Sequence, residues 1–527
     1  MRLRFSLFLA AIALFAASVP DGQRWWSHVL YLADDKLQGR NTGSEGHRQA
    51  AAYVAGEFER AGLKPAGTSG YIQPVKFKTR RLIEEQSSLA IVRDGREEKL
   101  KLGEDAIIGV RSEPADSVEA PLVFVGYGLS ILEKNSEKHY DDFAGMDVRG
   151  KIAVFISGGP PSIPGPLSSH YQSAGERSAI LKRVGVVGAC TIANPRSMDV
   201  PWSRSSLARF QPSMSLADPA LDDAGALKIS VTVNPAHADT IFTGSGHTFQ
   251  EILDLANAGK PLPHFAIPAK LKATTRVERG EVESQNVAAI LPGGDPKLKN
   301  EYVVLSAHLD HLGVGRPVNG DSIYNGAMDN ASGIAAMLDV AQTLHESGAK
   351  LSRSVLFVAV TGEEKGLLGS KFFANHPTVD SKSIVADINT DMFLPLFPLH
   401  RLTVYGLDES DLGDDVRAVA KTMGIEVQPD PEPIRNVFIR SDQYSFIRRG
   451  IPALSMKVGY AKGSPEEQTS KNWLKERYHA PSDDVNQPVD KKAAADFDRL
   501  VARLIEKVAN QAERPKWKDT SFFKRFA

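Results

Sequence analysis

The sequence predicts an α/β fold: a mixed, mostly parallel sheet flanked by helices, with a smaller β-rich domain inserted into it. After about residue 285, near-continuous apolar runs alternate with helical patterns, as expected for strands that are buried on both faces of a sheet. Between about 116 and 268, shorter strands are separated by a long loop rich in Gly, Pro and Ser. The length of 527 residues and the hydrophobic fraction of 42% allow two or three domains with cores of their own.

The main domain is expected to open with a helix and short strands. Ala50, Val54 and Phe58 recur at helical spacing, and Gly62 followed by Pro65 ends this helix. From about 73 to 135, short alternating runs predict strands. Later strands are expected over 301–307, 354–360, 384–390, 401–406 and 452–458, and helices over 329–345 and near 490–510.

The domain boundaries follow from these changes of pattern. Residues 1–18 are expected to be a signal peptide, and 19–115 the first part of the main domain with its lead-in strands. Residues 116–268 are expected to form the inserted domain, 269–510 the body of the main domain, and 511–527 a C-terminal tail.

The first residues have the pattern of a secretory signal. A basic start, MRLR, precedes an apolar run from Phe5 to Ala17 that is short for a membrane span, and the small residues Ala16 and Ser18 suit cleavage. An uncleaved N-terminal anchor is the alternative. We therefore expect an exported protein, periplasmic or extracellular, with no stable membrane span after the signal is removed.

Charge and cysteine content exclude several kinds of function. The formal net charge is −1, and acids and bases are interspersed without a basic stripe, which argues against a nucleic-acid partner. The single cysteine, Cys190, rules out an intrachain disulfide and a cysteine-based zinc site.

Five separated stretches carry the side chains of a two-metal site. They are SAHLDH around His308, GAMDNASG around Asp329, TGEEKG around Glu364, INTDM around Asp391 and RYHAPSDD around His479. Imidazole and carboxylate ligands suit zinc. Most of these stretches follow apolar strands, whose carboxyl ends meet at one edge of a parallel sheet. Each residue alone has an ordinary explanation, such as a helix cap or a loop histidine, but buried unpaired carboxylates are unfavourable, so the set together favours a metal site.

Three neighbouring residues have expected roles beside the ligands. Glu363 is left over to move a proton as a general base. Asp310, two residues after His308, is expected to share its face of the strand and to accept the second imidazole N–H. His311 is expected to point away and is left out of the ligand set.

These motifs, in this order, resemble those of the M28 family of co-catalytic zinc peptidases. The segment 35–67 is similar to the opening of that family, and 116–268 is similar to the protease-associated (PA) domain often inserted in such enzymes. The resemblance implies an aminopeptidase that acts on peptides with two zinc ions per chain. It also implies that Asp329 bridges the ions, His308 and Asp391 complete one site, and Glu364 and His479 complete the other. The family has a non-proline cis peptide after the bridging aspartate, here Asp329–Asn330.

The mechanism expected from this set is metal-assisted hydrolysis. A water bridging two ions would be the nucleophile, Glu363 would take its proton and pass it to the leaving amine, and Tyr478 would donate to the developing oxyanion. One position departs from the family pattern: Gln443 stands where many relatives carry His, and it is expected to flank the substrate pocket.

Three alternatives stay open. A carboxypeptidase of the same fold would need a basic pocket, for which Arg435, Arg440, Arg448 and Arg449 are candidates. A glutaminyl-cyclase-like zinc aminoacyltransferase would share the fold, and a zinc count would help to separate it. A non-catalytic binding protein on this scaffold would usually have lost ligands, whereas every ligand is present here.

Overall fold

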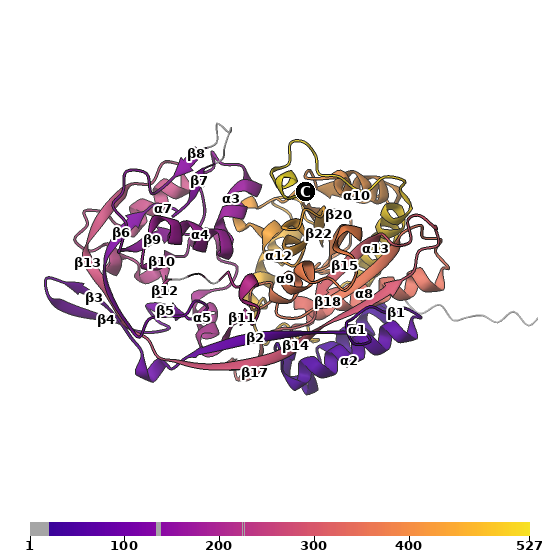
Figure 1. Cartoon of the computed structure of the whole chain (residues 1–527), viewed down its shortest axis with the longest axis horizontal. Helices are drawn as coiled ribbons and strands as arrows, with labels where there is room; N and C mark the ends of the chain where they lie inside the picture. The colour runs from indigo at the N-terminus through magenta and orange to yellow at the C-terminus, as the bar shows by residue number, and fades with distance from the viewer. Residues whose placement is uncertain (1–20, 133–138, 224, 226) are drawn as a thin grey trace, which may run out of the picture.

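The computed structural model describes residues 21–132, 139–223, 225 and 227–527, so the expected signal peptide lies outside the described residues. Two large sheets lie at opposite ends of the molecule, and the long strands β2 and β14 run along one side of it (Figure 1). The predicted mixed α/β class is confirmed.

The first sheet has ten strands in the order β11-β2-β14-β18-β15-β19-β22-β20-β21, with β1 paired to β14. Its central strands β18, β15, β19 and β22 are parallel to one another. On either side of them, β14 pairs with β18 and β20 pairs with β22 in antiparallel fashion. All seven residues of β18 are buried, which explains its unbroken apolar sequence. The strands are β1 (Lys64–Pro65), β2 (Ile72–Leu82), β11 (Ser213–Leu216), β14 (Val277–Leu291), β15 (Tyr302–His308), β18 (Ser354–Val360), β19 (Ile384–Asn389), β20 (Arg401–Tyr405), β21 (Glu426–Gln428) and β22 (Ala453–Val458).

Helices cover both faces of this sheet. Val303 and Leu305 of β15 pack into a core that includes α1, α2, α8 and α13, whereas Val304 packs on the opposite face with α9 and α11. Alternate side chains of a strand point to opposite faces, so this one strand contributes to both cores. The helices are α1 (Gln23–Leu32), α2 (Glu45–Arg60), α8 (Ser332–Glu346), α9 (Leu368–Asn375), α10 (Asp411–Thr422), α11 (Gln443–Ile447), α12 (Pro465–Glu476) and α13 (Lys491–Asn510).

The second sheet has eight strands in the order β4-β3-β13-β6-β9-β10-β12-β5. We call the part of the chain from 88 to 274 that contains this sheet the second unit. Its strands are β3 (Ser88–Arg93), β4 (Arg96–Leu100), β5 (Ala106–Gly109), β6 (Ser117–Val125), β9 (Ile152–Ile156), β10 (Gly188–Ile192), β12 (Ile229–Val233) and β13 (His264–Thr274). The helices along this stretch are α3 (Gly165–Gln172), α4 (Ala174–Val184), α5 (Trp202–Ser205), α6 (Asp239–Phe242) and α7 (Phe249–Asn257).

The second unit is connected to the first sheet at three places. The chain passes from β2 to β3 and returns from β13 to β14, and β2 and β14 pair over eleven residues. Between these two crossings, β11 leaves the second unit and pairs with β2, with Leu216 opposite Phe77. The second unit is therefore attached along a hydrogen-bonded edge. The expected boundaries of the inserted domain, 116–268, stay a prediction.

Two hairpins and the last residues complete the fold. The hairpins are β7 (Ser130–Leu132) with β8 (His139–Asp141), and β16 (Gly313–Val318) with β17 (Asp321–Tyr324). The C-terminal segment packs on the main domain through Trp517 and Phe523, which are both buried. The Trp517 indole N–H donates to the Gly450 carbonyl over 2.8 Å.

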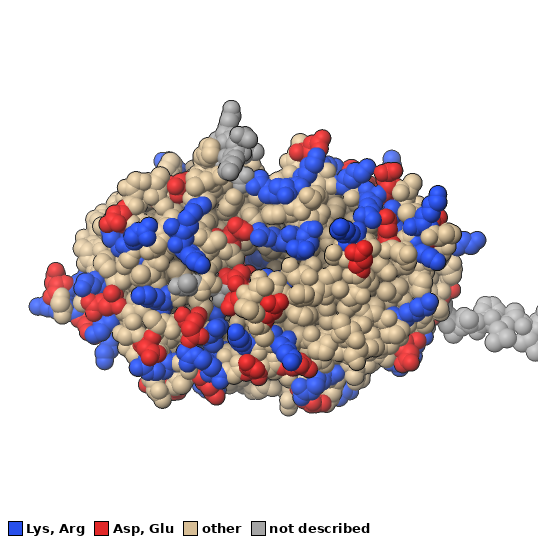
Figure 2. Space-filling model, viewed as in Figure 1, with Lys and Arg blue, Asp and Glu red and all other residues tan. Residues whose placement is uncertain are grey.

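The charged side chains are spread over the visible face in both signs, without a broad patch of one sign (Figure 2). In the part of the chain that the structure describes, no helix combines the length and the apolar character needed to cross a membrane.

Candidate metal centre

The structure brings all five predicted ligand residues together at one edge of the first sheet. His308 ends β15, Glu364 follows β18 and Asp391 follows β19. These three strands are parallel neighbours, so their carboxyl ends lie side by side. Asp329 reaches the same place from the turn before α8, and His479 from the loop after α12.

Asp329 lies at the middle of this group and divides it in two. Its Oδ1 is 3.3 Å from Nε2 of His308, which is 3.4 Å from Oδ1 of Asp391. Its Oδ2 is 3.3 Å from Nε2 of His479, which is 3.2 Å from Oε2 of Glu364. A tetrahedral zinc ion with bonds of about 2.0–2.1 Å separates its ligand atoms by about 3.3–3.4 Å. The spacing therefore fits two cations that share the Asp329 carboxylate.

Burial supports this reading of the geometry. His308 and Asp329 are 1% and 2% exposed, and Asp329 Oδ2 has no hydrogen-bond partner among the described residues. Burial would lower the pKa of His308, but the Glu363 charge and hydrogen bonds to Asp329 and Asp391 outweigh it and raise this pKa well above its usual value. Carboxylates that lie this close together in a buried site require neighbouring cations, either protonated imidazoles or metal ions.

Glu363 lines the same hollow as His308, Asp329 and Asp391. Burial is the main reason that its pKa is raised well above the usual range, and the nearby carboxylates of Glu364 and Asp442 add to this. A bound cation would lower this pKa again, because it favours the charged carboxylate. Glu363 is thus placed to exchange a proton in the pocket.

The Asp310 carboxylate does not accept from His308 as predicted. The Nδ1 of His308 lies 3.1 Å from the main-chain carbonyl of Asp310, not from its carboxylate. That carboxylate instead accepts from the Thr42 hydroxyl over 2.8 Å and from the Glu363 main-chain N–H over 3.1 Å. The predicted contact is wrong because β15 ends at His308, so strand alternation no longer fixes the direction of Asp310. Asp310 positions the Glu363 backbone instead.

His311 points toward the metal centre, contrary to prediction. Its Nδ1 is 2.7 Å from Oε1 of Glu364 and 3.7 Å from Oδ2 of Asp329. The shorter distance is that of a hydrogen bond and is too short for two ligands of one tetrahedral ion. His311 therefore orients Glu364, while His479 lies at ligand spacing.

Asp483, a residue that the sequence did not single out by itself, fixes the turn that carries Asp329. Its carboxylate accepts from the main-chain N–H groups of Met328 and Asp329 over 2.9 and 3.0 Å. The expected cis peptide between Asp329 and Asn330 is present in this turn. The signal for Asp483 was its place in the RYHAPSDD stretch, four residues after His479.

Arg40 is a buried residue that contacts the loops leading to Asp310 and Asp329. It is 1% exposed, and its guanidinium donates to the carbonyls of Leu309, Asn325 and Gly326 over 3.0, 2.7 and 3.0 Å, and also to that of Leu32. Burial lowers the pKa of Arg40 to about 10, against the raising effect of nearby carboxylates, so the side chain stays charged at neutral pH.

Two hollows meet at His479. A cavity of about 330 Å³ is lined by Glu364 and His479 on one side and by Arg204 and Leu207, from the segment before β11, on the other. Such a volume is at the lower end of small-ligand sites. Arg204 also donates to the carbonyl of Lys475 over 3.0 Å, at the end of α12. This contact holds α12 against the segment that carries β11.

The second hollow contains the candidate oxyanion donor. Tyr478 lines it, with its ring centroid 4.0 Å from that of His479. Burial raises the pKa of Tyr478 well above its usual value, so its hydroxyl remains a donor.

The four arginines considered for a basic pocket separate into two pairs. Arg435 and Arg440 line the hollow beside the metal centre, whereas Arg448 and Arg449 line a different pocket together with residues of α4. Of the four arginines considered for a basic pocket, two therefore lie beside the metal centre.

Gln443 does not flank the pocket as expected. It is 1% exposed, its Oε1 accepts from Asn389 over 2.7 Å, and its amide donates to the Phe438 carbonyl over 2.8 Å. The expectation is wrong because Gln443 begins α11 and faces the buried end of β19.

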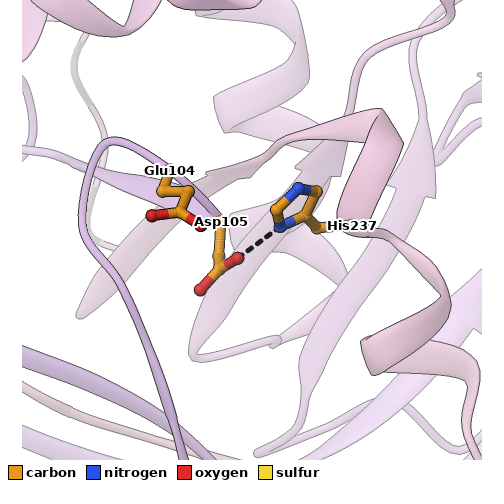
Figure 3. Close-up of side chains that lie close together, drawn as sticks. All are labelled: Glu104, Asp105 and His237. Carbon is orange, nitrogen blue, oxygen red and sulfur yellow. Dashed lines mark hydrogen bonds and ion pairs between the residues drawn. The ribbon is translucent and has the colours of Figure 1, made fainter.

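A third group of possible ligands lies in the second unit. Figure 3 shows Glu104, Asp105 and His237 close together, with the imidazole facing Asp105. His237 Nδ1 and Asp105 Oδ1 form a hydrogen bond, and Glu104 pairs with Lys101 over 3.3 Å. These polar groups satisfy one another, so the contact joins the turn before β5 to the segment after β12.

The sequence and the fold are similar to those of known peptidases. The model of peptidase family M28 matches residues 286–505. The probable leucine aminopeptidase 2 of Aspergillus fumigatus is 28% identical over 277 residues, which cover 50% of this chain and 50% of that protein. The chain spans about half the length of the curated relatives it matches.

Two solved structures share the fold over nearly the whole chain. An aminopeptidase from Aneurinibacillus sp. strain AM-1 gives a TM-score of 0.55 at 20% identity, covering 94% of this chain and 95% of its own. The zinc aminopeptidase BSAP from Bacillus subtilis gives 0.51 at 18% identity, covering 94% and 96%.

Proposed function

We propose that this chain, whose residues 286–505 match the model of peptidase family M28, is a dinuclear zinc aminopeptidase that removes N-terminal residues from peptides. The observation that carries the proposal is the Asp329 carboxylate, whose two oxygens each face a different imidazole at the spacing of zinc ligands. The name of the Aspergillus fumigatus relative supports an aminopeptidase in particular.

Five side chains would hold the two ions. Asp329 would be shared, His308 and Asp391 would complete one site, and Glu364 and His479 would complete the other. His311 and Asp483 would orient Glu364 and Asp329 through the hydrogen bonds described above. Zinc bound in this way supplies a Lewis acid and lowers the pKa of water toward neutrality.

Three groups of the chain would act on the peptide. Glu363 takes a proton from the attacking water and delivers it to the leaving amine, because it lines the hollow without serving as a ligand. The Tyr478 hydroxyl donates a hydrogen bond to the oxygen of the scissile carbonyl. Asp310 keeps Glu363 in place through the main-chain N–H of that residue.

The remaining parts of the sequence-based hypothesis are proposed with it. We infer export to the periplasm or medium from the leader at 1–18, and a PA-like inserted domain over 116–268 from the resemblance. A carboxypeptidase keeps some support from Arg435 and Arg440, which line the metal-side hollow. The binding-protein alternative is weakened because the whole ligand set converges.

A direct test is hydrolysis of aminoacyl p-nitroanilides by the purified chain. We expect two zinc ions per chain by elemental analysis, loss of activity with a chelator and recovery with zinc. Release of C-terminal residues from N-blocked peptides, without cleavage of the nitroanilides, would instead support the carboxypeptidase. Zinc binding without hydrolysis of either substrate would reject both peptidase assignments.

A further inference from the structure

Three cationic side chains line the hollow beside the metal centre. Arg435, Arg440 and Lys457 line it together with the metal ligands. In the proposed function, the bound metal ions balance the negative charges of the ligand carboxylates. The three cations therefore face the space that a substrate would fill next to the scissile bond.

The second unit contributes a carboxylate that orients two of these cations. Asp199 accepts from Nε of Arg435 and from Nη1 of Arg440, in each case over 2.7 Å. Its side chain is 8% exposed, while that of Arg440 is 41% exposed. A carboxylate that bridges two guanidinium groups fixes their direction, and it leaves the Nε and Nη2 donors of Arg440 without a partner among the described residues.

Lys457 adds a third cationic side chain to the hollow. It lies on β22, and no described carboxylate forms an ion pair with its ammonium group. Arg435 also pairs with Glu432 over 3.1 Å. Arg435 therefore has two carboxylate partners, whereas Arg440 shares one of them and Lys457 has no ion-pair partner among the described residues.

We propose that Arg440 and Lys457, with Arg435 and Asp199 as their supporting pair, form a subsite that binds a substrate carboxylate next to the metal centre. The proposal rests on the proposed function and narrows its substrate class to peptides with an anionic group close to the scissile bond. A free Arg donor pair and an ammonium group are the usual partners of a carboxylate. The second unit thereby takes part in substrate recognition through Asp199.

The carboxylate has two possible sources, and two pairs of substrates distinguish them. Glutamyl and glutaminyl p-nitroanilides differ only in a side-chain carboxylate. Leucylglycine and leucylglycine amide differ only in a C-terminal carboxylate. We expect the carboxylated member of one pair to show the higher kcat/KM in the zinc-loaded wild-type protein.

Variants then connect this preference to the residues. Lys457→Met and Arg440→Gln should each lower the ratio of kcat/KM between the carboxylated and neutral members by about tenfold or more, the scale of one charge-assisted hydrogen bond. The matched control is Arg449→Gln, an exposed arginine of a different pocket, which should leave the ratio unchanged.

The outcomes separate the two proposals. If the wild type hydrolyses the neutral members and shows no preference in either pair, the subsite is refuted and the aminopeptidase stands. If none of the four compounds is hydrolysed, the proposed function fails and the subsite with it. A wild-type preference that both variants keep would also overturn the assignment to Arg440 and Lys457.

Discussion

Replacing Arg40 tests whether the N-terminal segment holds the metal centre together. Arg40→Met keeps an unbranched side chain but removes the donors to the carbonyls of Leu32, Leu309, Asn325 and Gly326. The Gly326 carbonyl also accepts from the Ala331 main-chain N–H over 3.1 Å, so three of the four carbonyls would be left unpaired. At about 1 kcal/mol each, the lower end of the usual range, this gives a loss of about 3 kcal/mol in unfolding free energy. Because the carbonyls of Leu309, Asn325 and Gly326 belong to loops that lead to Asp310 and Asp329, zinc affinity should fall as well.

The measurement is urea unfolding of wild type, Arg40→Met and Arg40→Lys, each with a zinc titration. Arg40→Lys keeps the charge but has three donors on one atom, so it should lie between the other two. The control is Arg48→Met, since the Arg48 side chain is half exposed on α2 and pairs only at the surface. A loss of less than about 1 kcal/mol in Arg40→Met, with unchanged zinc affinity, would refute the reasoning, because it would be smaller than the expected cost of leaving one carbonyl unpaired.

Three further predictions concern the proton, the metal and pH. Glu363→Gln should keep the zinc content and lower kcat by about 10²–10⁴; near-normal turnover would show that another group is the base. His479→Ala should reduce zinc from two ions to one by elemental analysis, whereas the exposed His345→Ala should not. Burial lowers the pKa of His170 to about 3 from 6.5, so below pH 6.5 the unfolded chain binds a proton that the folded chain does not. The unfolding free energy should therefore fall by about 1.4 kcal/mol for each pH unit below 6.5 through this group. His170→Phe should make this slope shallower in urea unfolding at pH 5 to 7, and an unchanged slope would contradict the assignment.

The convergence of the five candidate ligands could be predicted from sequence because three of them follow apolar strands. His308, Glu364 and Asp391 lie close together because their parallel strands are neighbours and end at the same edge of the sheet. The prediction failed one step beyond the strands. Asp310 and His311 lie in irregular backbone after His308, where period-two alternation no longer gives the direction of a side chain.

Other contacts were out of reach because they join distant parts of the chain. Asp199 and Arg435 are 236 positions apart, and nothing in either local pattern indicates the ion pair. Arg40 belongs to a segment whose motif suggested the opening of the main domain, but its role depends on carbonyls of loops nearly three hundred positions later. Gln443 was misplaced because its neighbours in sequence line the pocket while its own side chain turns inward.

The short strand β11 has a mechanical consequence. It stitches the second unit to the edge of the first sheet through four residue pairs beside the eleven of β2 and β14. A hinge motion of the second unit would have to break the hydrogen bonds of that edge, so the cavity between His479 and the segment before β11 should keep a fixed width.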